Sequence, residues 1–310
     1  MSWRVSSPGD MDYGDALEIR SILVEKARLP PELEEKALEI ISRVPASGDM
    51  DLATLEDLRQ SLRSEQFGNE ANLVGVLTDV SLIPGRSSRN QILRINRKQL
   101  WLRCVQIPIH ESFKGNVLDY PPLSNPKPDV TCGFSAEAFT LAQKITLQTL
   151  FDGGRGSYAM PDMNTVFPFF TIEFKSEATH GTHFVARYQA ANPGAIALNG
   201  KLHLAEHSFG LDAFDQKEPH HFSITIAYTS ARVNLHWVER PAKKGPTVFH
   251  VTALEHYPLM HIDGLVALSR AIRNILEYGV KTLLPKIREG LDAYKQKAAQ
   301  RSSKTTRRKK

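Results

Sequence analysis

Two acidic residues and a lysine have the types and spacing of a metal site that cleaves phosphodiesters. Asp129 follows Pro128, and a later hydrophobic run ends in Glu173-Phe174-Lys175. Carboxylate oxygens are the ligands that hard cations such as Mg²⁺ prefer, and a cation held there can polarise a phosphoryl oxygen and activate a water. An ammonium beside it can orient that water and offset charge on the phosphate. The sequence therefore predicts Asp129 and Glu173 as ligands of Mg²⁺ or Mn²⁺ and Lys175 as the residue that positions the water.

Both acids lie in segments with the pattern of β-strands. Successive side chains of a strand alternate between its faces, so Glu173 and Lys175 share one face of the run 167–175, while Phe170, Ile172 and Phe174 lie on the other. The same alternation places Asp129 on one side of its strand and Val130 on the other. Neighbouring strands would thus bring three ionisable groups together. An ordinary exposed ion pair between Glu173 and Lys175 is the alternative.

These segments resemble the PD-(D/E)XK nuclease superfamily, and specifically an uncharacterised fungal domain family that carries its core. The resemblance covers about residues 65–285 and depends on the stretches 127–135, 167–177, 186–191 and 233–237. It implies a restriction-endonuclease-like core in the order helix, three strands, helix, strand. It also implies a further metal-ligating glutamate on the first helix and a polar residue on the second.

The first helix of that core is expected near residues 69–77, where apolar side chains recur on one face and leave Glu70 beside them. Glu70 is therefore our candidate for the additional metal ligand. A first-turn glutamate favoured by the helix dipole is the alternative reading of Glu70. Glu65 and Glu56 are the substitutes.

For the second helix, the resemblance implies that Gln189 holds the active-site lysine or the nucleic-acid backbone. A glutamine amide can both donate and accept hydrogen bonds. The tyrosine that some branches place four residues later is absent, because position 193 is proline. A plain surface position on the helix is the alternative for Gln189.

The positive charge of the chain is concentrated at its end. The formal net charge is +5, but residues 301–310 contain six Lys and Arg residues, so residues 1–300 are close to neutral. This segment has no apolar side chain to pack, and we expect a disordered tail that is recognised by nuclear import factors or binds nucleic-acid phosphates. A solubilising end is the alternative. The predicted nucleic-acid-binding residues are Arg307, Arg308, Lys309 and Lys310.

The remaining composition predicts an intracellular protein. Cys104 and Cys132 are too few for a disulfide framework, and the first residues do not have the pattern of a secretion signal. No stretch approaches the roughly 18–20 consecutive apolar residues that span a bilayer, so we expect no membrane partner. Nuclear localisation follows from the basic tail.

The length and 41% hydrophobic content favour one elaborated α/β domain with a mixed central sheet flanked by helices. We expect a helical extension over 1–64, the nuclease-like domain over 65–297 and the tail over 298–310. Expected helices cover 13–28, 31–43, 52–63, 136–151, 181–191, 195–206, 262–279 and 283–297. Expected strands cover 101–108, the segment around Asp129, 167–175, 222–228, 232–239 and 247–254. A flexible glycine turn is expected at 153–156.

Other readings remain open. His203-Leu-Ala-Glu-His207 fits a zinc-protease pattern if it lies on a helix. His180 and His183 could approach a substrate phosphate or donate a proton. A fold does not fix activity, so a non-catalytic nucleic-acid-binding or scaffold protein that retains the core is the alternative function.

Overall fold

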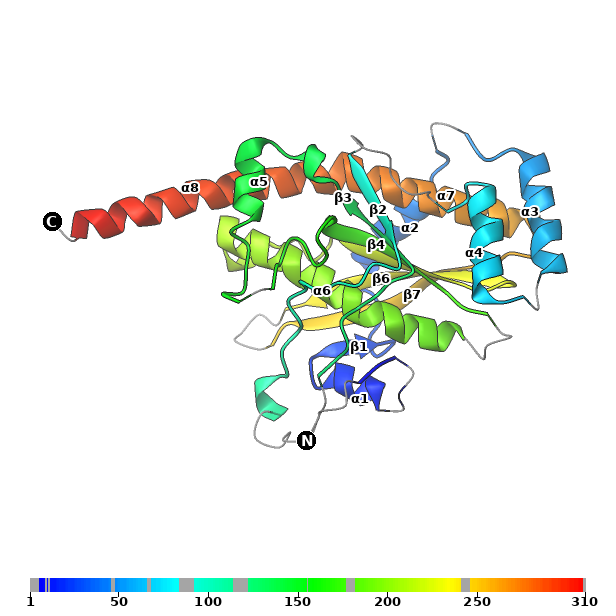
Figure 1. Ribbon diagram of the computed structural model, residues 1–310, viewed down its shortest axis with the longest axis horizontal. Helices are drawn as coiled ribbons and strands as arrows, with labels where there is room; N and C mark the ends of the chain where they lie inside the picture. Colours follow the sequence, from blue (N-terminus) through cyan, green and yellow to red (C-terminus); the bar gives the residue numbers. More distant parts are fainter. Residues whose placement is uncertain are drawn as a thin grey trace.

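A mixed seven-stranded sheet forms the centre of the protein (Figure 1). The computed structural model describes residues 6–8, 10, 12–45, 48–65, 68–83, 92–113, 122–154, 156–176, 182–240 and 246–308, with the backbone alone at 211 and 301–308. The strand order is β1-β7-β6-β5-β4-β3-β2; β1 is parallel to β7 and β4 to β5, and the other pairs are antiparallel. The strands are β1 (Ile22–Val24), β2 (Leu93–Arg97), β3 (Val130–Phe134), β4 (Val166–Phe174), β5 (His221–Ile226), β6 (Ser230–Glu239) and β7 (Val248–Pro258).

Helices cover the sheet, as expected for the α/β class. The long α6 (His183–Phe209) contacts five strands from β4 to β1, and α7 (Ile262–Tyr278) contacts β7, α2 and α3 (Figure 1). The other helices are α1 (Tyr13–Glu18), α2 (Pro31–Ser42), α3 (Leu52–Ser64), α4 (Glu70–Asp79), α5 (Leu141–Leu147) and α8 (Leu284–Arg308). None of the helices in the described part of the chain is long and apolar enough to cross a membrane.

Most of the predicted core elements are confirmed. The strands β5, β6 and β7 and the helices α2, α3 and α7 lie where the periodicity placed them. Asp51 accepts a hydrogen bond from the backbone N–H of Thr54 at 2.8 Å and starts α3. The glycine turn near residue 153 is present, with Gly153 at φ +86°, while Arg155 lies outside the described residues.

The helix expected over 13–28 is wrong. The segment forms only α1 and then β1, which pairs with the edge of β7. Ser21 and Glu25 flank β1, each with a φ of +56°. This conformation ends a helix, and serine and glutamate do not predict it. The 1–64 segment is thus not only helical: β1 extends the sheet, and α2 packs against α7.

Two other expected elements also differ. Residues 101–108 form no strand, and the strand next to β3 is β2. The helix expected over 136–151 shortens to a single 3₁₀ turn, Ala136–Ala138, followed by α5. Thr140 and Gln143 form a capping box that starts α5, so the helix begins at 141.

The break expected at Asn192-Pro193-Gly194 is absent, because α6 runs without interruption through Pro193. Close packing on the sheet explains the difference. A Cβ at Gly194 would lie 2.0 Å from the ring of His236, and a Cβ at Gly200 would lie 2.0 Å from the Tyr158 carbonyl oxygen. Contacts this tight along the helix outweigh the one hydrogen bond that a proline removes.

The last helix is longer than expected. A π-turn, Gly279–Leu283, joins α7 to α8, and α8 continues to Arg308. Residues 298–308 are therefore helical backbone, where we expected a disordered tail. The segment 284–308 contains no glycine after 290 and no proline after 285, so nothing in its sequence stops the helix. Lys309 and Lys310 lie outside the described residues.

Candidate active site

Asp129 and Glu173 lie opposite each other on neighbouring strands. Val130 of β3 pairs with Ile172 of β4, and one step further along this antiparallel register brings Asp129 opposite Glu173. The Asp129 Oδ2 accepts a hydrogen bond from the backbone N–H of Phe174 at 2.9 Å. Like charges directly opposite each other on a sheet repel, so this pair needs a compensating positive charge.

Burial and mutual repulsion raise the pKa values of this pair. Glu173 is only 4% exposed, and burial, followed by the charge of Asp129, raises its pKa well above the usual glutamate range. Lys175 lowers the pKa of Glu173 in part, while the charge of Glu70 raises it. Burial also raises the pKa of Asp129, while the Phe174 N–H lowers it. A bound cation would relieve this repulsion.

Two lysines and Glu70 complete the cluster. Lys175 Nζ lies 3.9 Å from Glu70 Oε2 and donates a hydrogen bond to the carbonyl oxygen of Phe174 at 2.8 Å. Lys98 Nζ lies 3.5 Å from Glu70 Oε1 and 3.8 Å from Asp129 Oδ1. The three acids and Lys175, predicted from sequence alone, are therefore brought together, with Glu70 in the first turn of α4 as expected.

Lys98 is a member of the cluster that the sequence did not reveal. It follows the last residue of β2, where its backbone N–H donates to the Asp129 carbonyl oxygen at 3.0 Å and its φ is +49°. Correct placement of β2 next to β3 would have identified it, because Arg97 pairs with Val130 and the following residue must lie beside Asp129. Lys98 is thus a cross-strand neighbour of the acidic pair.

The carboxylate oxygens of the cluster suit a hard cation, but only two of its three acids are placed to bind one. In the residues that the structure describes, no three His, Cys, Asp or Glu side chains form a group that could hold a metal ion as they stand. Asp129 and Glu173 converge, whereas Glu70 contacts Lys98 and Lys175. Two carboxylates with retained waters is a usual arrangement for Mg²⁺. The residues therefore fit a cation on Asp129 and Glu173, with Glu70 in its electrostatic surroundings.

Gln189, on α6, lies near Glu173. Both residues line a cavity of about 150 Å³, together with Tyr13 and Asn192. The Gln189 Oε1 is buried and has no hydrogen-bond partner among the described residues. Burial, and then the charge of Glu173, raises the pKa of Tyr13, which places this buried hydroxyl in the field of the acidic pair.

His183, the histidine near β4 that the structure describes, is held by side chains of β5 and β6. His183 Nδ1 lies 2.8 Å from Thr225 Oγ1, and its Nε2 lies 2.9 Å from Ser230 Oγ. Burial lowers the pKa of His183 to about 4, so it is neutral and structural. Both ring nitrogens have partners, and the approach of His183 to a substrate phosphate stays a prediction. His180 lies outside the described residues.

The zinc-protease reading of His203, Glu206 and His207 is also not supported. The three lie on α6, but the two imidazoles stack, with ring centroids 4.0 Å apart. His207 Nδ1 is 2.9 Å from the His203 carbonyl oxygen, and Glu206 forms an ion pair with Arg240 at 2.8 Å. Stacked rings do not aim their nitrogens at one point, as zinc ligands must.

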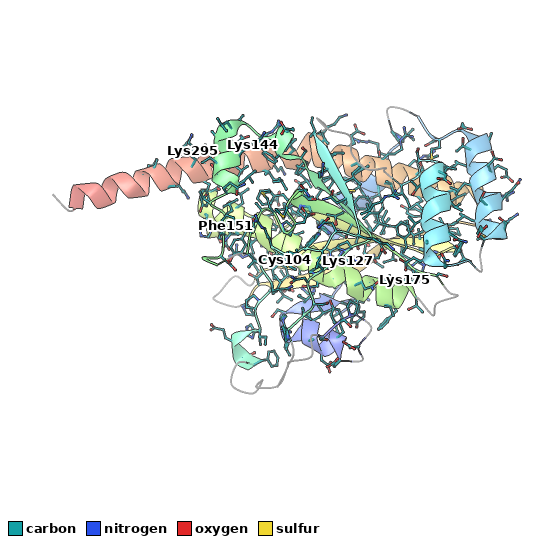
Figure 2. All side chains as sticks on the ribbon, viewed as in Figure 1. Cys104, Lys127, Lys144, Phe151, Lys175 and Lys295 are labelled. Carbon is teal, nitrogen blue, oxygen red and sulfur yellow. The ribbon has the colours of Figure 1, made fainter. Side chains whose placement is uncertain are left out.

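The basic end of the chain lies away from the acidic pair. Figure 1 shows α8 projecting beyond the sheet, so the backbone at Arg307 and Arg308 is far along this projection. Figure 2 shows Lys175 well apart from Lys144 and Lys295, which lie on α5 and α8. Any contact between the tail and nucleic acid would therefore be separate from the cluster.

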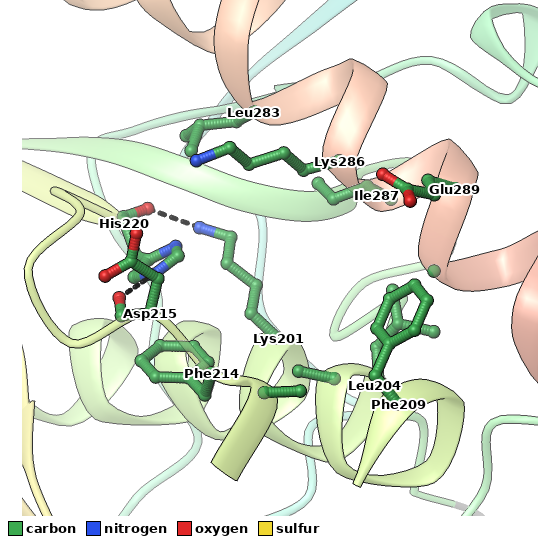
Figure 3. A pocket seen from close by; sticks show the side chains of 13 residues that line it. Lys201, Leu204, Phe209, Phe214, Asp215, His220, Leu283, Lys286, Ile287 and Glu289 are labelled. Atoms are coloured by element: carbon green, nitrogen blue, oxygen red, sulfur yellow. Dashed lines mark hydrogen bonds between the residues drawn. The ribbon is translucent and has the colours of Figure 1, made fainter.

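A second cavity, of about 290 Å³, lies between α6 and α8 (Figure 3). Lys201 points into it and donates hydrogen bonds to the carbonyl oxygens of Pro168, at 3.1 Å, and His220. Burial lowers the pKa of Lys201 to about 7. Because it satisfies two backbone acceptors, Lys201 has a structural role that needs no ligand.

Comparison with known proteins gives one finding. A family described as a domain of unknown function (DUF7924) matches residues 59–291, which include the acidic pair, both lysines and Gln189. A search of curated proteins found no match. Because the match covers most of the chain, the protein belongs to the DUF7924 family.

Proposed function

We propose that this protein is a nuclease that hydrolyses phosphodiester bonds of nucleic acid with Mg²⁺ or Mn²⁺. The observation that carries the proposal is the position of Asp129 opposite Glu173 on adjacent strands, with Lys175 beside Glu70. Two carboxylates with raised pKa values and a nearby ammonium form an unfavourable arrangement for stability alone. Such an arrangement is typical of a site built for a cation and a charged substrate.

Each residue has a distinct role in the proposed reaction. Asp129 and Glu173 hold the cation, and Glu70 adds negative charge from α4. A cation held there would supply charge stabilisation at the phosphoryl oxygen and would make a bound water more acidic. Lys175 orients the attacking water and offsets charge that develops on the phosphate. Gln189 contacts the substrate from α6.

The order of elements also supports the proposal. The helix, three strands, helix and strand implied by the resemblance to PD-(D/E)XK nucleases have counterparts in α4, β2, β3, β4, α6 and β5. In this assignment the acids come from the second and third strands and the glutamine from the second helix. The basic residues 307–310 would add non-specific, salt-sensitive affinity for nucleic acid or contact import factors, which suits action in the nucleus.

One observation favours a second candidate, a non-catalytic nucleic-acid-binding or scaffold protein. Lys98 and Lys175 already neutralise part of the acidic charge without a metal. A core that had lost turnover could be stabilised in this way. The two candidates differ in what a divalent cation does to the substrate.

Cleavage assays separate them. Single- and double-stranded DNA and RNA are incubated with the full chain and Mg²⁺, Mn²⁺ or EDTA, and the chain is compared with Asp129→Asn and Lys175→Ala. We expect metal-dependent cleavage that falls by about 100-fold or more in both variants, the size of effect typical of lost charge stabilisation. Lys144→Ala, on the distant α5, is the matched control and should retain activity. Binding without cleavage by the folded native chain would favour the second candidate.

A further inference from the structure

A buried lysine without an acidic partner lies in the wall of the cavity between α6 and α8 (Figure 3). Lys201 is 5% exposed, and among the described residues it forms no ion pair with a carboxylate. Burial is the only influence that shifts its pKa, whereas a carboxylate close by would raise that pKa. Lysine is almost never buried unless it is paired. The charged form of Lys201 therefore lacks a counter-ion in the described part of the chain.

The ammonium of Lys201 has one donor more than the backbone takes up. A lysine ammonium has three N–H donors, and the carbonyl oxygens of Pro168, at 3.1 Å, and of His220 accept two of them. These neutral acceptors hold the group in place and leave its charge uncompensated. Figure 3 shows the amino end of Lys201 toward His220 and Lys286, which also line the cavity. The third donor has no acceptor among the residues described, so it is available to an anion that enters there.

The rest of the cavity wall is largely apolar. Buried side chains of α6, α8 and the segments that precede them supply this wall: Leu204, Phe214, Leu283 and Ile287. Phe209 also lines the cavity and is 49% exposed, so it marks the side that faces solvent. The volume of about 290 Å³ is close to the lower end of the range for small-molecule pockets, about 300 Å³. An occupant with an apolar body and one anionic end would match this lining.

The other charged residues of the lining favour a single negative charge on the occupant. Asp215 and Glu289 line the cavity with exposed carboxylates, which would repel a second anionic group. Lys286 forms an ion pair with Glu218 at 2.5 Å, so its charge is already compensated. One buried positive charge, that of Lys201, is therefore left to be matched.

We propose that this cavity binds a small apolar monocarboxylic acid, with its carboxylate on Lys201 and its hydrocarbon body against the apolar walls. A carboxylate would neutralise the ammonium and accept its third N–H in a charge-assisted hydrogen bond, so the complex would bury no net charge. A phosphate monoester, with up to two negative charges, would leave one of them beside Asp215 and Glu289. The site is separate from the acidic pair, and the proposal does not depend on nuclease activity.

Octanoate and octanamide test the proposal, since they share a hydrocarbon tail and differ in charge. Each is titrated into the full chain at neutral pH without nucleic acid, and binding is measured by calorimetry. We expect octanoate to bind about tenfold more tightly or better, the usual size of a hydrogen bond between charged groups. Equal binding of the two, or no binding of either to the folded chain, would overturn the proposal.

Proton uptake shows whether the carboxylate reaches Lys201. Burial lowers the pKa of Lys201 to about 7, so the free amine is largely neutral at pH 8 and must take up a proton to pair with octanoate. Calorimetry in two buffers of different ionisation enthalpy should give close to one proton per octanoate. Burial also lowers the pKa of the neighbouring histidines, which are therefore neutral in this range: His220, His221 and His236. Binding without proton uptake at pH 8 would contradict contact with Lys201.

Variants locate the site. Lys201→Met should remove the preference for octanoate over octanamide. Ala205→Phe places a ring in the cavity and should abolish the binding of both, which keeps the test decisive if Lys201→Met does not fold. Lys295→Met is the matched control, because Lys295 lines a separate apolar hollow between α5 and α8, and it should bind octanoate as the native chain does. Melting temperatures measured alongside show which variants are folded. Native affinity in folded Ala205→Phe, or loss of binding in Lys295→Met, would assign octanoate to another surface and refute the proposal.

Discussion

Lys98 contacts Asp129 through both its backbone and its side chain. The backbone N–H of Lys98 donates to the Asp129 carbonyl oxygen at 3.0 Å, and its Nζ lies 3.8 Å from the Asp129 carboxylate. The ammonium thus approaches the side of Asp129 on which a cation would also be attracted. The side chain is 55% exposed, so it can move into solvent when another cation binds.

We expect Lys98→Met to strengthen Mn²⁺ binding by about fivefold. An ammonium about 4 Å from a carboxylate in a water-like medium contributes about 1 kcal/mol, and a competing cation gains this amount when the ammonium is removed. Isothermal titration calorimetry of the native chain and the variant measures the difference. Lys127→Met removes a nearby exposed ammonium across the neighbouring cavity and is the control. An unchanged or weaker affinity in Lys98→Met would contradict competition.

Glu173→Gln should stabilise the metal-free protein. The pKa of Glu173 is raised in the folded state, so the folded state binds more protons than the unfolded one. The stability is therefore fully present below the unfolded pKa and falls as pH rises toward the folded pKa. A neutral glutamine removes this loss, and we expect a gain of about 1 kcal/mol or more at neutral pH.

Urea unfolding in EDTA, from about pH 5 to 8, measures this effect. The native chain should lose stability relative to Glu173→Gln as pH rises. Glu137→Gln, at a surface carboxylate, provides the control. Mn²⁺ should stabilise the native chain and not Glu173→Gln. If the variant is less stable than the native chain at every pH, the hydrogen bonds of the Glu173 carboxyl group outweigh the repulsion between the two acids.

Lys201→Met should change the alkaline side of the stability profile. Burial lowers the pKa of Lys201 to about 7 from its usual 10.5, so the unfolded state binds more protons between these values. The stability of the native chain therefore receives a contribution that rises with pH through this window. Methionine removes that contribution and leaves the Pro168 and His220 carbonyl oxygens without their donor.

The measurement is the difference in unfolding free energy between the native chain and Lys201→Met from about pH 7 to 9. The unfolding free energy of the native chain should increase relative to that of Lys201→Met as pH rises. Lys295→Met, at a lysine of α8 that lies beside α5, is the control. A difference that is independent of pH would mean that Lys201 keeps an ordinary pKa in the folded state.

Two glycine substitutions should have opposite effects. A Cβ at Gly200 would lie 2.0 Å from the Tyr158 carbonyl oxygen, so Gly200→Ala must displace α6 and should cost about 3 kcal/mol. A Cβ at Gly75 on α4 meets nothing within 4 Å, so Gly75→Ala should stabilise by about 0.5–1 kcal/mol. Chemical denaturation of both variants tests the pair. Similar effects on stability at the two positions would show that the fold does not need α6 to approach the Tyr158 carbonyl oxygen so closely.

The elements that could be predicted from sequence each have a clear periodic pattern of apolar residues. The alternation around Glu173 placed the two acids and Lys175 correctly, because β4 is buried on both faces and pairs with β3 over its regular part. Strands β5 to β7 are apolar enough to be recognised without their partners. The position of Glu70 followed from the apolar face of α4.

The remaining features depend on contacts distant in the chain. Three-residue β1 exists because β7 offers its edge, and no local pattern marks it. Continuity of α6 at Pro193 follows from its packing on the sheet, whereas the proline itself indicates a break. Lys98, Tyr13 and Asn192 join the site from three separate segments, so only the folded arrangement brings them to the acidic pair.

The short strand β1 has a consequence for aggregation. It covers the edge of β7 over Ile22, Leu23 and Val24, and its three-residue length leaves little exposed backbone for another chain to pair with. The family match begins at residue 59, after β1 and Tyr13. A chain trimmed to 59–291 would uncover the edge of β7 at Phe249, His250 and Val251, and we expect it to associate with itself edge to edge. We therefore expect the solubility of the protein to depend on the first 58 residues.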